Sequence, residues 1–156
     1  AYDELADAIF RHCYFRTSDR EIAKDLAQDT FTKTWEYLAR GGEIQNLKAF
    51  LYRTARNLII DHYRHKKTHS LDALMEDGFE PPDTGESPLA YSERREVILT
   101  IEKLDTEYRN VITMRFLEGL SPKEIADITG EKENTISVRI HRGLKKLKEE
   151  FDPPNL

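Results

Sequence analysis

A stretch rich in proline, glycine and acidic residues lies near the middle of the chain and limits the fold more than any other feature. Residues 68–90 contain two glycines and three prolines, at Gly78, Gly85, Pro81, Pro82 and Pro88. A proline inside a helix removes a backbone hydrogen bond and clashes with the preceding turn, so a long helix cannot cross this stretch. We therefore predict two small domains, at residues 1–67 and 92–151, joined by a flexible acidic linker at residues 68–91.

Apolar residues recur at helical spacing on both sides of this linker, and no segment shows the alternation typical of a β-strand. Before the linker, we expect two helices within residues 1–39 and a long helix over residues 47–66. After it, we expect helices over residues 91–103 and 106–118, followed by a further pair. The predicted fold class is therefore all-α, with a helical bundle in the first domain.

The last pair of helices is typical of a helix-turn-helix. Ser121 can cap the shorter helix, Pro122 suits its first position, and Glu124 completes a capping box. Thr129 and Gly130 suit the tight turn between the two helices. The longer helix is expected at residues 132–150, with inward positions at Ile136, Ile140, Leu144 and Leu147. Its other face carries short polar and basic side chains, which suit the base edges and phosphates of duplex DNA.

The net charge of −5 argues against DNA binding at first sight, but the charges are unevenly distributed. Residues 38–69 carry seven basic and two acidic groups, and residues 131–151 carry six basic and four acidic groups. Between them, residues 70–96 carry two basic and eight acidic groups. On the long helix before the linker, a stripe of basic residues lies opposite the apolar stripe. Two DNA-facing surfaces in an acidic chain would have this pattern.

Two parts of the sequence resemble a known family. The similarity to region 4 of sigma-70 family factors is carried by LDTEYRNVITMRFLEGLSPKEIADITGEKENTISVRIHRGLKKLKEEF. The similarity to region 2 is carried by DLAQDTFTKTWEYL and NLKAFLYRTARNLIIDHYRHKK. Their order, and the linker in place of a domain between them, resemble the extracytoplasmic-function group. The resemblance implies a bacterial sigma factor that binds core RNA polymerase and directs promoter-specific transcription initiation. Region 2 would recognise and melt the −10 element, and region 4 would recognise the −35 element.

The resemblance also implies site residues, position by position. The positions that match the polymerase-docking motif are Asp25, Gln28 and Asp29. The positions that match the helix facing the −10 strand are Tyr52, Arg53, Asn57 and Arg64. In region 4, the position that matches a phosphate contact is Arg115, and those that match the recognition helix are Thr135, Ser137, Arg139, His141 and Arg142. An acidic, hydrogen-bonding surface for polymerase and basic surfaces for DNA are physically consistent with these assignments.

The sequence departs from the family pattern at two of these places. The loop at residues 40–46 aligns with the family's base-capture loop, but Gly41 stands where an aromatic residue is frequent. Ser137 stands where lysine or arginine is usual, which removes a long cation from the recognition helix and alters the expected −35 preference. Trp35 matches a position that is usually aromatic, and we expect it in the core.

Two other classes of function remain open at this point. The first is a stand-alone helix-turn-helix regulator that binds duplex DNA as a dimer, which leaves the docking motif and the second basic helix unexplained. The second is a helical interaction protein that has lost DNA binding, which only Ser137 and the altered loop favour. We expect no enzymatic activity, no cofactor and no metal site, because no nucleotide loop, ligand cluster or nucleophile–base pair has a suitable spacing.

The expected partners are core RNA polymerase, promoter DNA and an anti-sigma factor, the last because family members are commonly held inactive by one. No apolar run approaches the ~20 residues that cross a bilayer, and the first residues lack the order of a signal peptide. Cys13 is the one cysteine, and we expect it to be a small buried hydrophobe. These features predict a cytoplasmic protein without membrane insertion.

Overall fold

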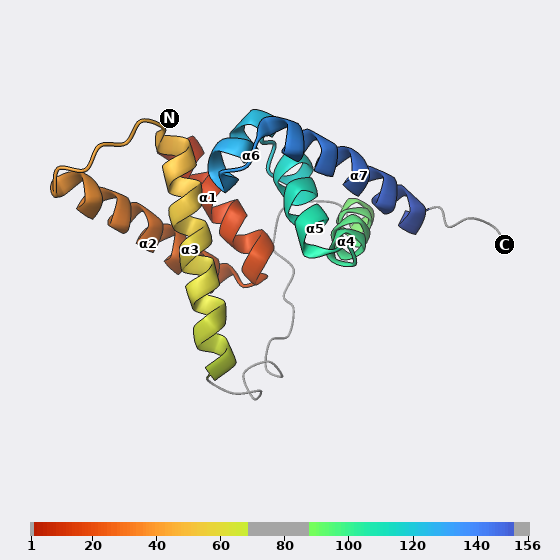
Figure 1. Cartoon of the computed structure of the whole chain (residues 1–156). Coiled ribbons are helices and arrows are strands. Elements are labelled where there is room, and N and C mark those ends of the chain that lie inside the picture. The colour runs from red at the N-terminus through yellow and green to blue at the C-terminus, as the bar shows by residue number, and fades with distance from the viewer. Residues whose placement is uncertain (1, 69–87, 152–156) are drawn as a thin grey trace. The chain divides into compact units, whose positions relative to one another are not determined.

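The computed structural model describes residues 2–68 and 88–151, and these residues form helices without any strand (Figure 1). They divide into two compact units, with the division falling between the third and fourth helices. Most of the expected linker lies outside the described residues. The helix that follows it begins at Pro88, three residues before the expected start at Tyr91.

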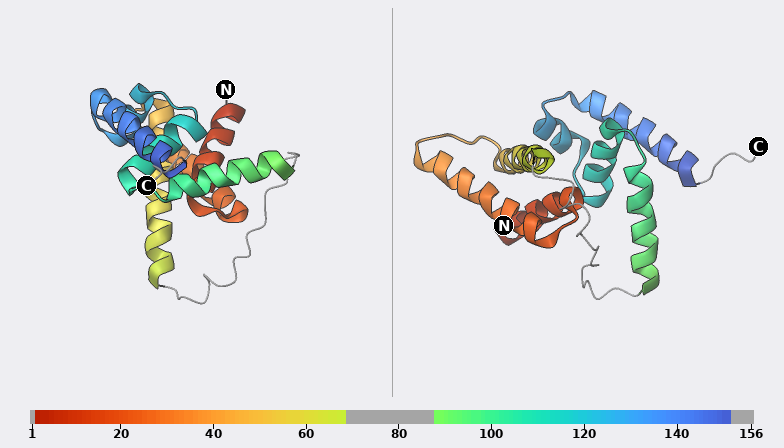
Figure 2. Two further views of the ribbon diagram at one scale, coloured as in Figure 1. Left: turned by 90° about the vertical axis from the view of Figure 1, so that its right-hand side faces the viewer. Right: turned by 90° about the horizontal axis from the view of Figure 1, so that it is seen from below.

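The first unit is a bundle of three helices, α1 (Tyr2–Thr17), α2 (Arg20–Ala39) and α3 (Leu47–Thr68), each of which packs on the other two (Figures 1 and 2). The start of α2 was expected at residues 18–19, and Asp19 caps it by accepting hydrogen bonds from the amides of Glu21 and Ile22. The buried stripe of α2 consists mainly of small side chains, namely Ala23, Leu26, Ala27, Thr30 and Thr34. Both threonine hydroxyls donate to carbonyls one turn earlier, which satisfies them inside the bundle.

The core of the first unit agrees with the expected stripe of α3, since Leu51, Ala55 and Ile59 are buried and Leu58 is half-buried. Cys13 is buried as expected. His12 is buried beside Cys13, although histidine side chains are less often fully buried than apolar ones. A histidine on the inward face of α1 shares the burial of its apolar neighbours whatever its chemistry.

The second unit contains α4 (Pro88–Glu102), α5 (Thr106–Ile112), η1 (Thr113–Leu117), α6 (Pro122–Thr129) and α7 (Glu133–Phe151). The sequence predicts one continuous α-helix to residue 118, but η1 is a π-helical turn. There the amide of Glu118 donates to the carbonyl of Thr113, five residues earlier, at 3.0 Å. Gly119, with φ +71°, then ends the helix at the expected place.

The helix-turn-helix predicted from the sequence is formed by α6 and α7. The hydroxyl of Ser121 accepts from the Glu124 amide at 3.1 Å, and the Glu124 carboxylate accepts from the Ser121 amide at 3.0 Å, so the capping box is complete. Gly130 has φ +79°, which supplies the left-handed residue that the tight turn requires. The inward face of α6 is formed by Ile125, Ala126 and Ile128, which are buried.

The buried stripe of α7 differs from its prediction in its second half, where Leu147 is half-buried rather than buried. Ile136 and Ile140 are buried as expected, but Leu144 is 39% exposed and Gly143 is buried in its place. A Cβ atom at Gly143 would lie 2.9 Å from Cγ1 of Ile112, so the missing side chain allows α7 to approach α5 closely. A stripe drawn from apolar residues overlooks a contact made by a glycine.

The capping box gives a first testable prediction. Ser121→Ala removes the acceptor of the Glu124 amide at the start of α6, and should lower the free energy of unfolding by about 1 kcal/mol. Thermal unfolding followed by circular dichroism would measure this. Ser137→Ala, at an exposed position inside α7, is the matched control and should change stability by less than about 0.5 kcal/mol. Equal effects of the two substitutions would contradict the capping role.

Candidate functional site

The expected basic face of α3 is present. Asn46 caps the helix by accepting a hydrogen bond from the Ala49 amide at 3.1 Å. The side chains of Arg53, Asn57 and Arg64 are all exposed, and the exposed residues of this helix also include Arg56 and Ile60. These groups form one surface with positive charge, an amide and an apolar side chain. Such a surface can bind a phosphate backbone and contact bases.

Tyr52 does not belong to this surface, which corrects the expectation that it faces DNA. Its side chain is only 1% exposed, and its ring meets that of His12 edge-on at a centroid distance of 5.0 Å. The physical reason is its register, because Tyr52 precedes the buried Ala55 and Ile59 by three and seven residues on the same helix face. The aromatic ring therefore stabilises the bundle between α1 and α3.

Tyr37, near the end of α2, contacts the loop at residues 40–46. The ring of Tyr37 lies beside that of Phe50 at a centroid distance of 5.0 Å, and its hydroxyl donates to the carbonyl of Glu43 at 3.4 Å. A Cβ atom at Gly42 would collide with the Tyr37 ring, so only glycine permits this approach. Tyr37 is partly exposed and provides an aromatic surface next to Gly41. The sequence interpretation missed Tyr37, although an aromatic residue close before two glycines is a usable signal.

The three docking residues of α2 are exposed on its surface, as the resemblance implies. Trp35 is not in the core as expected, because its side chain is 64% exposed. It lies two helical turns after Gln28, on the same side of α2. The inward face of α2 is filled by alanine and threonine, so the large indole lies at the edge of the helix rather than in the bundle.

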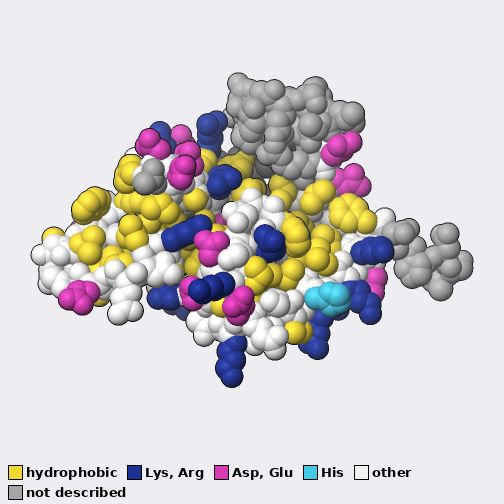
Figure 3. Space-filling model, turned by 90° about the horizontal axis from the view of Figure 1, so that it is seen from above, with side chains coloured by type: hydrophobic (Ala, Val, Ile, Leu, Met, Phe, Trp, Pro, Cys, Tyr) yellow, Lys and Arg dark blue, Asp and Glu magenta, His cyan; other side chains and the backbone are white. Residues whose placement is uncertain are grey.

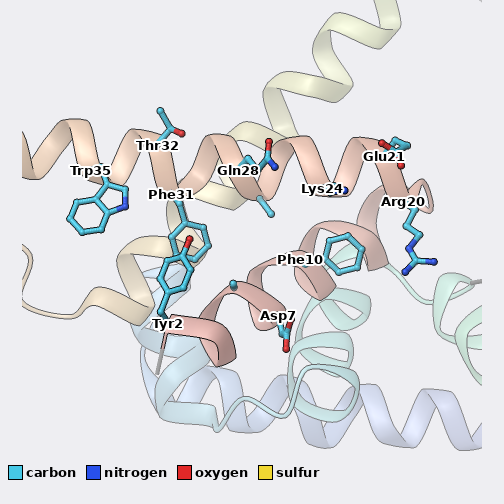
Figure 4. Close-up of a pocket in the computed structure, with 12 residues that line it drawn as sticks. Tyr2, Asp7, Phe10, Arg20, Glu21, Lys24, Gln28, Phe31, Thr32 and Trp35 are labelled. Carbon is cyan, nitrogen blue, oxygen red and sulfur yellow. The ribbon is translucent and has the colours of Figure 1, made fainter.

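Gln28 and Trp35 line a groove between α1 and α2 (Figure 4). The rings of Tyr2 and Phe31 face each other within it at a centroid distance of 5.2 Å. Arg20, Glu21 and Lys24 lie toward the other end of the groove, and its lining also includes Ala6, Asp7, Phe10, Ala27 and Thr32. The groove thus offers an aromatic end and a charged end to another molecule.

The predicted DNA-contacting residues of the recognition helix α7 differ in their exposure to solvent. Ser137, His141 and Arg142 are exposed, whereas Thr135 and Arg139 are half-buried. Figure 3 shows lysine and arginine side chains around a histidine over the part of the chain that contains α7. Val138, which the sequence interpretation did not select, is 39% exposed among these polar groups. An exposed valine in the middle of a recognition helix can contact the methyl group of thymine.

Arg139 is engaged by acidic groups of its own unit. Its Nη1 atom donates to Oε1 of Glu131 at 2.5 Å, and its Nε atom lies 3.9 Å from Oε2 of Glu107. The hydrogen bond to Glu131 is the main cause that raises the pKa of Arg139 above its ordinary value.

Arg115 lies in η1, at the start of the segment that leads into the helix-turn-helix. Its Nη1 atom donates to the carbonyl of Leu120 at 3.4 Å, and its guanidinium lies 5.7 Å from the ring centroid of Phe116. It is half-buried, so part of the side chain remains accessible to a phosphate. Its contact with Leu120 places it directly before the Ser121 cap of α6.

Within residues 2–68 and 88–151, no histidine, cysteine and carboxylate side chains are grouped in a way that could hold a metal ion. None of the helices in the same residues combines the length and the apolar character that a membrane span requires.

Family models match both units of the chain. The model of Sigma-70 region 2 matches residues 1–69, and the model of Sigma-70, region 4 matches residues 94–147.

Similar proteins are also found among curated sequences and solved structures. The extracytoplasmic-function RNA polymerase sigma factor SigW of Bacillus subtilis is 30% identical over 163 residues, covering 96% of this chain and 86% of SigW. The extracytoplasmic-function RNA polymerase sigma factor BldN of Streptomyces coelicolor is 28% identical over 155 residues. The match spans 94% of this chain but only 57% of BldN. The structure of CnrH in complex with the cytosolic domain of CnrY has a TM-score of 0.64 and 26% identity, covering 98% of this chain and 83% of CnrH.

Proposed function

The chain belongs to the sigma-70 family of RNA polymerase sigma factors, in its extracytoplasmic-function group, and from this premise we propose that it binds core RNA polymerase and directs it to promoters. The first unit would dock on polymerase and recognise the −10 element, and the second would recognise the −35 element. The single observation that carries the proposal is the exposure of a docking surface and of two basic surfaces in one chain. A sigma factor of this kind acts as a non-enzymatic subunit. Because polymerase acts on the chromosome, we also propose a cytoplasmic location.

The docking surface is the exposed side of α2. Asp25, Gln28 and Asp29 lie on it, and Trp35 extends it along the groove between α1 and α2. The two carboxylates suit a basic partner, and the large exposed indole can supply apolar contact at the centre of an interface. The aromatic and charged ends of the groove together suit a helical element of polymerase better than they suit a small molecule.

The docking assignment predicts a loss of polymerase binding when both carboxylates are removed. Asp25→Ala with Asp29→Ala should weaken the affinity for core polymerase by about tenfold, since each charged interface contact contributes on the order of 1 kcal/mol or less when partly solvated. Titration of fluorescently labelled chain with core polymerase would measure the change. The control is Glu149→Ala with Glu150→Ala, which removes the same charge from the exposed end of α7. Normal assembly of the Asp25 and Asp29 variant would show that the docking surface lies elsewhere.

The DNA surfaces follow from the two basic faces. Arg53, Asn57 and Arg64 on α3 would contact the melted −10 strand, with the loop at residues 40–46 beside them. In the second unit, Ser137, His141 and Arg142 would face the −35 duplex, and Arg115 would contact a phosphate. The exposure of the residues on α3 and α7 and the positive charge of the arginines support these contacts, and Ser137 also lies near the N-terminus of α7.

The experiment that tests the proposal is transcription in vitro from fragments of the host genome, with and without core polymerase. The proposal requires that defined start sites appear only when both the chain and core polymerase are present. The alternative of a stand-alone regulator requires tight binding to duplex DNA at moderate salt without polymerase, which a gel shift would detect. The proposal would be wrong if the chain bound duplex tightly alone and did not change the start sites of core polymerase.

We further propose an anti-sigma factor as a protein partner. The CnrH structure contains the cytosolic domain of a second protein, CnrY. The match to CnrH covers 98% of this chain and 83% of CnrH. A partner that covers the exposed side of α2 would compete with polymerase. Recovery of polymerase as the one specific partner of the tagged chain from its native host would contradict this part of the proposal.

A further inference from the structure

The side of α7 that carries Arg139 differs from the exposed side of the helix. The exposed side contains Asn134, Val138, His141 and Lys145. At about 100° per residue, Arg139 is displaced by about 120° from Lys145 but by only about 60° from the buried Ile136. It is half-buried as a result, with a side-chain exposure of 27%.

The groups that face Arg139 come from two other elements of the unit. Glu131 belongs to the turn between α6 and α7, and Glu107 belongs to the first turn of α5. Lys146, two turns after Arg139 on the same side of α7, places its Nζ atom 5.5 Å from the ring centroid of Tyr108, also in α5. This side of the recognition helix therefore packs toward protein.

We propose that Arg139 is a positioning residue, which holds α7 against the turn and α5 through Glu131 and Glu107 and does not itself contact DNA. This inference rests on the proposed function and reassigns one residue within it. The guanidinium donates a directional hydrogen bond to Glu131 and is attracted to the Glu107 carboxylate at 3.9 Å, so the two contacts connect α7 to the turn and to α5. The exposed Arg142 then provides the cationic contact to DNA from α7.

The ion pair of Arg139 with Glu131 also affects the charge that the second unit would present to promoter DNA. Glu131 lies two residues before Glu133, the first residue of α7, at the end of the helix that DNA phosphates would approach. Arg139 neutralises this carboxylate at 2.5 Å. Removal of Arg139 alone would leave Glu131 to repel the phosphates, and promoter affinity would fall although no DNA contact was lost. Neutralisation of Glu131 in the same chain should reverse the fall.

The experiment compares R139Q with the double variant R139Q/E131Q, which keeps the net charge of the chain. Holoenzyme assembled from the full chain and core polymerase would be titrated with a promoter fragment at several salt concentrations. R139Q alone should weaken binding on the order of tenfold. The double variant should return to within about threefold of the wild type, with the wild-type dependence of affinity on salt, because two glutamine amides can still form a hydrogen bond between α7 and the turn and leave no unpaired carboxylate at residue 131.

The matched control makes the same charge changes at an exposed arginine of the same helix. R142Q should weaken binding and reduce the salt slope by about one, which is the signature of a lost phosphate contact. R142Q/E131Q should remain weak, because neutralisation of Glu131 does not replace a contact to DNA.

Two outcomes would overturn the proposal. The first is that R139Q/E131Q remains as weak as R139Q, with a salt slope lower by about one. The second is additive thermal stabilities in a double-mutant cycle of R139Q and E131Q measured without DNA, which would show that the pair does not couple. If the wild-type holoenzyme bound no promoter, the proposed function would fail, and the cycle would still test whether Arg139 positions the helix.

Discussion

Trp35→Ala is expected to weaken the binding of the chain to core RNA polymerase by about thirtyfold or more. The indole is 64% exposed and lies at one end of the groove between α1 and α2, two helical turns from Gln28 along α2. Exposed tryptophans at the centre of an interface commonly cost about 2 kcal/mol or more when truncated, which corresponds to this change in affinity. Titration of labelled core polymerase would measure it. The same variant should leave thermal stability nearly unchanged, because most of the ring is in solvent.

The control for this prediction is Phe151→Ala. Phe151 is another exposed aromatic residue, at 46%, but it lies at the end of α7 in the other unit. Its truncation should leave polymerase affinity within about twofold of the wild type. A Trp35 variant that bound polymerase as tightly as the Phe151 variant would place the indole outside the interface and would leave the docking motif without its apolar part.

The helix boundaries were predictable because they are set by local chemistry. Asp19 and Ser121 accept hydrogen bonds from amides of the helices that they begin, and Gly130 supplies a left-handed turn. These interactions connect residues at most four apart, so the pattern of residue types contains them. The π-turn at η1 was not predictable in this way, because the same residues also suit a regular α-helix.

The burial of individual aromatic residues was harder to predict. Trp35 was expected in the core, but its side chain is exposed. Tyr52 was expected on the DNA surface, but its side chain is buried in the bundle. Whether a side chain is exposed depends on which parts of its helix the neighbouring helices cover. The small buried side chains of α2 allow the neighbouring helices to pack closely, so an indole does not fit between them. Tyr52 lies on the same helix face as the buried Ala55, which brings its ring against His12 of α1.

The roles of Arg139 and Gly143 depend on contacts between segments that are distant in sequence. Arg139 was predicted to contact DNA from its place in the recognition helix, and the presence of Glu107 beside it could not be inferred before α5 and α7 were placed. Glycine carries no apolar signal, so Gly143 was absent from the predicted stripe. The candidate site was therefore predictable as a set of surfaces but not in the contacts that hold them in place.

Gly143→Val should lower the free energy of unfolding of the second unit by about 2–3 kcal/mol. A Cβ atom at this position would lie 2.9 Å from Cγ1 and 3.0 Å from Cδ1 of Ile112, and 3.5 Å from Cβ of Tyr108. Ile112 is fully buried, so it cannot move aside without disturbing the core. Amide hydrogen exchange of α5 and α7 would measure the loss within this unit, without a contribution from the first unit.

Two further variants separate overpacking from helix propensity. Lys145→Val introduces the same β-branched side chain at an exposed position two residues later and should cost about 0.5 kcal/mol. Gly143→Val with Ile112→Ala removes the atoms that the new side chain would meet, and should cost less than the sum of the two single changes. Simple additivity would mean that the valine at residue 143 does not meet Ile112. The close approach of α7 to α5, which also brings Arg139 to Glu107, would then need another explanation.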